Sequence, residues 1–353
     1  MMVLILLSAC DHDEQPLPGA DGLHFESLGL VTSSIEGISA QAGEIVVYSR
    51  CGGIYRTDVR NSSGEWTHLD VDCEVSPANE YEGLLASTAT DSFTLAALGL
   101  KSALPKMISR TRNGHPVNWV PADAGISTDT VLSLLATSNG SLWAATANKG
   151  VYASHDMGRT WTKRSLALSY LRARLIQQGD NLLIVGRGSA FGPILHISHD
   201  AGNSWNYGAI ADIPAVDGGS VIGAAILVDT TGHVIATVEG SSGSHLLVGN
   251  SETGAFHIIR SFPCRADVVV LPDHPTQVLI FADSLYVSQD RGRKWQSFSC
   301  PDQGTFGLST VDCATKRVYC WVMHGNTAEV FEVCGAMNEG RAGDAASCIS
   351  QAY

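Results

Sequence analysis

The sequence predicts an all-β protein: a seven-bladed β-propeller of four-stranded antiparallel blades, with the last blade closed by the N-terminal strand. Three observations lead to this fold class. A turn motif containing Asp, Gly and Trp is repeated along the chain, and aromatic residues recur about every 40 to 50 residues. Glycine is abundant, at 36 of 353 residues, which is typical of many short strands joined by tight turns. Hydrophobic residues make up 44% and charged residues 16%, so the chain has enough apolar surface for a packed core.

The first residues predict export. The apolar run from Met1 to Leu7 is much shorter than the roughly 20 residues of a membrane-spanning helix and is typical of the core of a secretory signal. The segment Leu7-Ser8-Ala9-Cys10 resembles the lipobox of bacterial lipoproteins, which implies acylation of Cys10, although no Lys or Arg precedes the run. The alternative is a buried N-terminal strand with an ordinary cysteine. We expect a signal peptide over 1–9, a flexible tether over 10–22, and a lipid-anchored protein in the bacterial cell envelope, facing the periplasm or the exterior.

The cysteine count fits an exported chain. Eight cysteines remain besides Cys10, and an even number in an oxidising compartment predicts disulfides. Local pairing is the expectation, with other connectivities open: Cys51 with Cys73, Cys264 with Cys300, Cys313 with Cys320, and Cys334 with Cys348. The last pair would pin a C-terminal tail over 335–353. No Cys-x-x-Cys pair occurs and no histidines cluster beside the cysteines, so no metal site is expected.

The repeated motif reads S-x-D-x-G-x-x-W and has three full copies. They comprise Ser154, Asp156, Gly158 and Trp161; Ser198, Asp200, Gly202 and Trp205; and Ser288, Asp290, Gly292 and Trp295. Ser and Asp side chains hydrogen-bond turn backbone, Gly adopts positive φ, and Trp packs between sheets. The motif therefore predicts a structural turn. Ser154-His155-Asp156 is not a catalytic triad, because side chains that are adjacent along a strand point to opposite faces.

The blades follow from the spacing of these motifs. Aromatic anchors fall at positions 66, 119, 161, 205, 256 and 295. The clearest repeat contains four apolar strands, over 131–135, 140–146, 150–154 and 161–164. A seventh set has three strands, over 306–311, 317–323 and 329–333. We expect residues 23–28 to supply its fourth strand, so that one propeller domain spans 23–334.

The motifs resemble the Asp-box, or BNR repeat, of sialidase-type β-propellers. That family grips the substrate carboxylate with three arginines, the first in an Arg-Ile-Pro motif, whereas this chain has Tyr55-Arg56-Thr57-Asp58 and no Arg-Ile-Pro. Seven blades also exceed the six of sialidases. The resemblance therefore extends to non-catalytic propellers, such as photosystem II assembly-factor-like proteins and sortilin-type domains, and implies binding of proteins or peptides.

Candidate ligand-binding residues lie in loops of one propeller face, those that lead into the innermost strand or join the second and third strands. These loops carry Glu36, Arg50, Glu82, Lys149, Arg172, Arg187, Glu239, Asp283 and His324. Arg50, Lys149, Arg172 and Arg187 form a predicted basic cluster that could hold an acidic group of a partner, or could instead pair with neighbouring carboxylates. Glu36 and Glu82 are the candidates for a catalytic acid/base pair; the alternative is solvated or ion-paired carboxylates.

These observations favour a non-catalytic, exported lipoprotein that binds a protein, peptide or glycan on its loop face. The alternative is a glycoside hydrolase, sialidase-like or polysaccharide-cleaving, that uses the paired carboxylates. The formal net charge of −13 argues against binding nucleic acid or an anionic membrane surface, so membrane attachment is expected through the lipid alone. No cofactor is expected, and the protein is expected to be a monomer.

Overall fold

The structure is a computed structural model in which the two chain ends and several loops are left undescribed. The described residues are 23–32, 35, 37–41, 43–49, 53–60, 65–69, 81–88, 93–100, 107–112, 120–121, 124–126, 129–137, 140–164, 169–178, 180–188, 192–210, 219–227, 233–240, 242–271, 274–312, 315 and 317–334. Between residues 81 and 121 the description covers the backbone.

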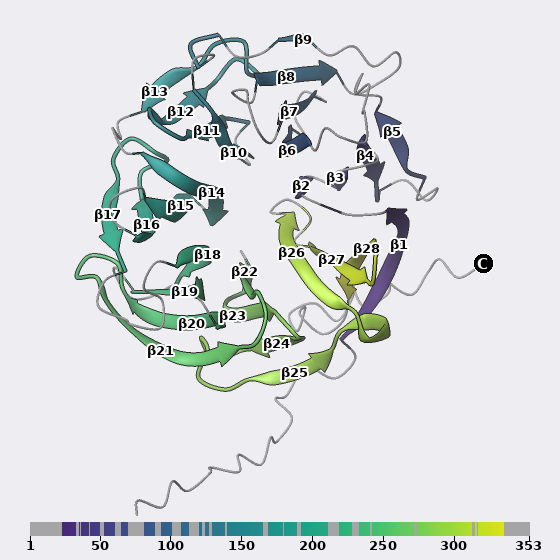
Figure 1. Cartoon of the computed structure of the whole chain (residues 1–353), viewed down its shortest axis with the longest axis vertical. Helices are drawn as coiled ribbons and strands as arrows, with labels where there is room; N and C mark the ends of the chain where they lie inside the picture. The colour runs from purple at the N-terminus through teal and green to yellow at the C-terminus, as the bar shows by residue number, and fades with distance from the viewer. Residues whose placement is uncertain are drawn as a thin grey trace, which may run out of the picture.

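Strand pairing groups the described strands into seven four-stranded sheets, which are the blades of a ring around a central channel (Figure 1). Neighbouring strands within each blade are antiparallel. Six blades each consist of four strands that are consecutive in the chain. The remaining blade is composite, because it joins three C-terminal strands to the N-terminal strand. The chain therefore closes its ring by hydrogen bonding between its two ends.

Blades 1 to 3 are built from the first half of the chain. Blade 1 contains β2 (Gly37–Gln41), β3 (Glu44–Ser49), β4 (Gly53–Asp58) and β5 (Thr67–Leu69). Blade 2 contains β6 (Tyr81–Thr88), β7 (Phe93–Leu100), β8 (Met107–Arg112) and β9 (Val120–Pro121). Blade 3 contains β10 (Val131–Ala136), β11 (Leu142–Thr146), β12 (Gly150–Ser154) and β13 (Thr162–Arg164).

Blades 4 to 6 continue around the ring. Blade 4 contains β14 (Tyr170–Gln178), β15 (Asn181–Gly188), β16 (Gly192–Ser198) and β17 (Asn206–Ala209). Blade 5 contains β18 (Ser220–Ile226), β19 (His233–Gly240), β20 (Gly243–Asn250) and β21 (Ala255–Phe262). Blade 6 contains β22 (Asp267–Leu271), β23 (His274–Phe281), β24 (Ser284–Ser288) and β25 (Gln296–Ser299).

Blade 7 is the composite one. A short 3-10 helix, η2 (Pro301–Gln303), leads into β26 (Thr305–Asp312), β27 (Arg317–His324) and β28 (Thr327–Cys334), and β1 (His24–Thr32) pairs with β28. The outer strand expected over 23–28 is shorter than the strand observed, β1. β1 continues to Thr32 because its register shifts between Ser27 and Val31, where Gly29 adopts a φ of 75°. A bulge of this kind lets a strand bend and then resume pairing.

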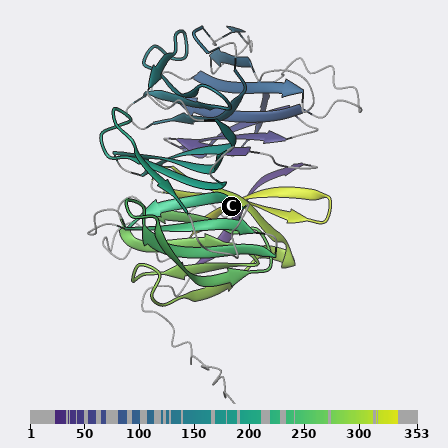
Figure 2. The same ribbon diagram turned by 60° about the vertical axis from the view of Figure 1, so that its left-hand side comes forward.

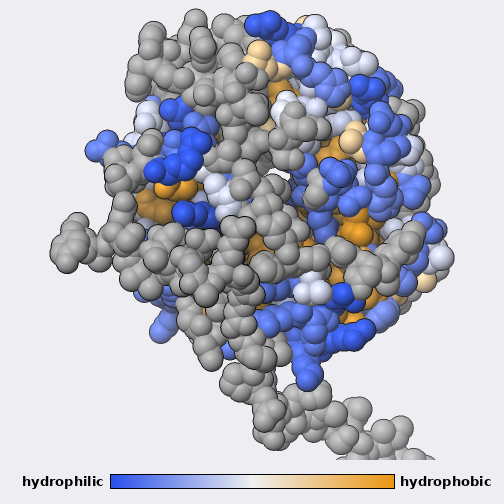
Figure 3. Space-filling view, turned by 180° about the vertical axis from the view of Figure 1, so that it is seen from behind, coloured by the Kyte–Doolittle hydropathy of each residue, from blue (hydrophilic) through white to orange (hydrophobic). Residues whose placement is uncertain are grey.

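The core lies between adjacent blades. Every residue of β11, β12 and β22 is buried, as expected for strands covered on both faces. One apolar cluster joins blades 4 and 5, and others join blades 5 and 6 and blades 6 and 7. Figure 2 shows the sheets stacked side by side, and the coloured atoms of the rear view in Figure 3 are mostly hydrophilic. Within the described part of the chain, no helix has the length and apolarity to span a membrane.

The two ends of each blade define two faces of the ring. The turn between the first and second strands lies at the same end as the turn between the third and fourth. The ring of His155 accordingly contacts the hydroxyl of Ser141, and that of His199 contacts the side chain of Asn181. We call this the motif face, because the three full turn motifs lie here. The opposite face, where the second strand turns into the third, we call the loop face.

Candidate functional site

The turn motifs are hydrogen-bonded turns on the motif face. In the first copy, the hydroxyl of Ser154 donates to Asp156 at 2.8 Å and accepts the amide of Gly158 at 2.9 Å. The same two contacts occur in the second copy at 2.8 and 2.7 Å, and in the third at 2.9 and 2.7 Å. Gly158 has a φ of 77°. The polar atoms of the motif are therefore used in hydrogen bonds that form the turn.

The carboxylates of two motifs are held in their charged form. Burial alone would raise the pKa of Asp156, but hydrogen bonds from Thr160 and Ser154 outweigh it and lower the pKa to about 2. The hydroxyl and amide of Ser204, followed by the hydroxyl of Ser198, likewise lower the pKa of Asp200 to about 2. A carboxylate stabilised as an acceptor in this way is poorly suited to donate a proton.

The glycine and tryptophan of the second copy also contribute to packing. Trp205 is buried and meets Trp143 of blade 3 edge-on. A Cβ added at Gly202 would lie 2.0 Å from the Trp143 ring, and Gly202 has a φ of 84°. Only glycine satisfies both conditions. The motif therefore packs adjacent blades against each other as well as forming the turn between two strands.

The central channel contains a cavity of about 490 Å³. The innermost strands β2, β10, β14, β18 and β26 line it, together with Glu239 at the end of β19 and Arg265 just before β22. Its wall carries the apolar side chains of Ile38, Leu171 and Ile222. Leu171 is 56% exposed, which is unusual for a large apolar residue next to a core.

Three arginines reach this cavity. Arg172 and Arg174 are two residues apart on β14, so their side chains leave the same face of the strand. Arg265 comes from the segment before β22. Arg172 forms an ion pair with Glu239 at 3.3 Å, and the two side chains are 70% and 44% exposed. A pair this exposed contributes little to stability and exchanges readily with other partners.

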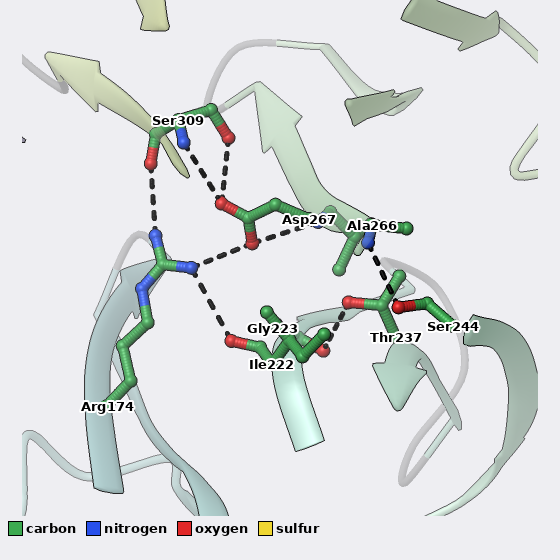
Figure 4. Close-up of polar contacts among 9 residues, drawn as sticks. Arg174, Ile222, Gly223, Thr237, Ser244, Ala266, Asp267 and Ser309 are labelled. Carbon is green, nitrogen blue, oxygen red and sulfur yellow. Dashed lines mark hydrogen bonds and ion pairs between the residues drawn. The ribbon is translucent and has the colours of Figure 1, made fainter. Parts of the chain in front are cut away.

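Arg174 is held differently, in a network that crosses four blades (Figure 4). It donates to Asp267 at 2.7 Å and to the carbonyl oxygen of Ser309 at 3.0 Å, with a longer contact of 3.5 Å to the carbonyl oxygen of Ile222. Asp267 also accepts the amide and hydroxyl of Ser309. A Cβ at Gly223 would come within 2.7 Å of Asp267, so the glycine makes room for this carboxylate. We call these contacts the Arg174 network.

Arg265 has no such partner among the described residues. Loss of surrounding water lowers the pKa of its guanidinium, which Asp267 opposes and Arg174 reinforces; Glu239 and Arg172 act more weakly in opposite senses. The site thus has three guanidinium groups against the carboxylates of Glu239 and Asp267. Although the whole chain has a formal charge of −13, the described part of this channel carries an excess of one positive charge.

The predicted basic cluster is partly brought together. Arg172 and Arg187 are direct cross-strand partners in β14 and β15. Lys149 is exposed in the β11–β12 turn, where its backbone amide donates to Asp129 at 2.7 Å. Arg50 and Glu36 lie outside the described residues, as does the side chain of Glu82.

Three residues of the site were missed by the sequence reasoning: Arg174, Arg265 and Asp267. One signal was available, because residues two apart along a strand leave the same face of the sheet. Arg174 follows Arg172 at that spacing, and Arg265 precedes Asp267 at the same spacing. The convergence of Arg174 from blade 4 with Arg265 and Asp267 at the start of blade 6 was not visible in the sequence.

The predicted cysteine pairing is wrong for Cys264 with Cys300. Both are free thiols, as is Cys320, the predicted partner of Cys313. Cys264 packs against the cluster between blades 5 and 6, whereas Cys300 belongs to the cluster between blades 6 and 7. Cys10, Cys51, Cys73, Cys313 and Cys348 lie outside the described residues.

Acid/base chemistry has few candidates in the described part of the cavity. Glu239 is the one carboxylate among its described lining residues, and it is paired with Arg172. Asp267 is 1% exposed and accepts several hydrogen bonds. Among the residues that the structure covers, no group of His, Cys, Asp and Glu side chains is arranged to hold a metal ion.

Comparison with known proteins supports the propeller fold. No family model and no curated protein sequence matches the chain. Among solved structures, YCF48 bound to D1 peptide is similar at a TM-score of 0.60 and 13% identity, over 90% of this chain and 96% of that one. Streptogramin B lyase is similar at 0.59 and 12%, over 88% and 98%.

A third similar structure is longer. The GH74 xyloglucanase from Xanthomonas campestris has a TM-score of 0.56 and 17% identity, over 85% of this chain and 52% of that enzyme. This chain therefore spans about half the length of that structure. At such identities the similarity establishes the fold, and the neighbours include both a peptide-bound protein and a glycoside hydrolase.

Proposed function

We propose that this protein is a non-catalytic propeller that holds a protein or peptide partner on its loop face, through an acidic group bound at the arginines of the channel. The observation that carries the proposal is the excess of guanidinium groups over carboxylates in the described cavity, where Arg265 forms no hydrogen bond or ion pair with a described residue. Arg binds carboxylates through paired hydrogen bonds, and a basic site within an acidic protein selects for acidic ligands.

The apolar wall supports a peptide as the ligand class. Leu171 is exposed beside Arg172, and Ile38 and Ile222 line the same cavity. An acidic residue with an apolar neighbour would place its charge at the arginines and its apolar side chain against this wall. The similar structure of YCF48 is described as bound to a peptide, which is consistent with this ligand class.

Export belongs to the same proposal. The segment ending at Cys10 is proposed to be a lipoprotein signal that anchors the propeller in the cell envelope, with the partner in the same compartment. The Leu7-Ser8-Ala9-Cys10 sequence supports it. Metabolic labelling with a fatty acid tests it directly, since Cys10→Ala should abolish incorporation.

Hydrolysis of a glycan is the second candidate, supported by the similarity to GH74 enzymes. It requires two carboxylates about 5–9.5 Å apart on either side of a glycosidic bond. In the described cavity, Glu239 is paired with an arginine and faces no second free carboxylate. Binding therefore has the stronger support.

A peptide-binding assay tests the proposal. The probe is a fluorescein-labelled, C-terminally amidated peptide of alternating Glu and Leu, and its counterpart has Gln in place of every Glu. We expect fluorescence polarisation to show salt-sensitive binding of the Glu probe, and the double variant Arg172→Gln/Arg265→Gln to weaken it about tenfold.

The matched control is Arg159→Gln/Arg293→Gln, which removes two exposed arginines on the motif face. It should bind the Glu probe as the unaltered protein does. Equal binding of the Glu and Gln probes, or an unchanged affinity in the channel double variant, would contradict recognition of an acidic group by this site.

A further inference from the structure

Glu239 occupies the position that an acidic ligand would need. Its carboxylate lies 3.3 Å from a guanidinium nitrogen of Arg172 and lines the cavity with Arg265. It stands near the end of β19, one residue before Gly240, where the chain turns into β20 on the loop face. This placement fixes a negative charge beside two of the three channel arginines.

The two carboxylates at the site differ in how firmly they are bound. Asp267 is 1% exposed and accepts four hydrogen bonds, from Arg174, Val268 and both polar groups of Ser309. Glu239 is 44% exposed, and its described partner is Arg172, which is itself 70% exposed. Solvent screens the second pair, so breaking it costs much less.

We propose that Glu239 is a displaceable counter-ion that occupies the carboxylate site of the free protein and leaves Arg172 when an acidic ligand binds. This inference rests on the proposed function and adds a specificity-determining residue to it. The ligand carboxylate takes the place of Glu239 on Arg172 and gains Arg265 as a second cation. Arg174 stays in its network with Asp267 and Ser309.

Because Glu239 must leave Arg172 before a ligand can bind there, its presence lowers the apparent affinity for every ligand. When the binding-competent state of the protein is only partly populated, a ligand binds more weakly by that fraction, and Glu239 also repels any incoming negative charge. A neutral ligand pays the same displacement without gaining an ion pair. The built-in carboxylate therefore favours ligands that offer a carboxylate of their own over those that only fit the apolar wall.

The test compares the unaltered protein with Glu239→Gln. Glutamine keeps the size of the side chain and removes its charge. Because the Glu239 side chain is 44% exposed, we expect the variant to fold normally. Two charged probes are used: the amidated Glu-Leu peptide, and a Gln-Leu peptide with a free C-terminal carboxylate, which separates a side-chain carboxylate from a chain terminus. The control is Glu252→Gln, an exposed carboxylate of the same blade on the motif face.

We expect Glu239→Gln to bind at least one charged probe about threefold more tightly at low salt, as for loss of an exposed ion pair, with Glu252→Gln unchanged. Equal or weaker affinity of Glu239→Gln, relative to the unaltered protein, for every charged probe that both bind would overturn the counter-ion role and leave the proposed function standing. Failure of both proteins to bind either charged probe would instead overturn recognition of an acidic group, and the counter-ion role with it.

Discussion

The guanidinium of Arg174 on β14 donates to the carboxylate of Asp267 on β22 at 2.7 Å, although the two residues belong to blades 4 and 6. Blade 5 lies between them, and its Ile222 contributes a carbonyl oxygen to the same guanidinium. Ser309 of blade 7 completes the network. One arginine thus connects four consecutive blades across the channel, including the composite blade that closes the ring.

The Arg174 network predicts that Asp267→Asn destabilises the protein. The asparagine amide group would face donors on Arg174 or Ser309, so at least one buried hydrogen bond is lost and one donor is left unpaired. We expect the free energy of unfolding to fall by about 2–3 kcal/mol, measured by urea denaturation. Asp180→Asn, at an exposed position in the β14–β15 turn, is the control and should leave the midpoint unchanged. A midpoint for Asp267→Asn equal to that of the control would show that the network adds no stability.

The turn motifs predict a stability effect without a binding effect. Asp156→Ala removes the acceptor for Ser154 and for the amide and hydroxyl of Thr160, at 2.8, 2.9 and 2.6 Å. Because this turn is partly exposed, we expect a loss of about 1–2 kcal/mol in thermal or urea unfolding, with the affinity for the charged probe unchanged. Weaker probe binding at unchanged stability would place the motif in the binding site instead.

The composite blade predicts that the ring depends on β1. This strand pairs with β28 along most of its length, and the backbone carbonyl of Leu28 accepts the indole N–H of Trp66 in blade 1. A chain that begins at residue 33 would expose the edge of β28 to pairing with other molecules. We expect that chain to aggregate in light scattering and to melt at a lower temperature, whereas a chain that begins at residue 23 stays soluble. A soluble, equally stable chain from residue 33 would refute closure by β1.

The residues show which parts of this structure were predictable. Trp161, Trp205 and Trp295 carry a local turn signal, so the blade spacing and the pairing of the two chain ends followed from the sequence. The Arg174 network did not, because it depends on how the ring brings β14, β22 and β26 around one channel. The Cys264–Cys300 pairing failed for a related reason. Distance along the chain does not reveal that these residues lie on opposite sides of blade 6.

Two glutamates face each other where the ring closes. Glu26 of β1 is directly opposite Glu332 of β28, and Glu332 accepts a hydrogen bond from Arg317 at 3.2 Å. Burial raises the pKa of Glu332, Arg317 opposes this shift, and Glu26 adds to it. The neighbouring groups on β27 and β28 are Tyr319, opposite Glu332, and Cys334, whose thiol lies 3.6 Å from Glu26.

A raised pKa in the folded state makes the contribution of Glu332 to stability depend on pH. That contribution is complete below the ordinary glutamate pKa of about 4.3 and is lost as the pH rises through the folded-state pKa. Glu26→Gln removes the like charge opposite Glu332 and leaves Arg317 in place. We therefore expect this variant to be about 0.2–1 kcal/mol more stable at pH 7, as for relief of a cross-strand like-charge pair, and equal to the unaltered protein near pH 4. Urea unfolding at both pH values measures the difference, with Glu252→Gln as the control. A gain of the same size at both pH values would contradict charge repulsion at the closing strand as its cause.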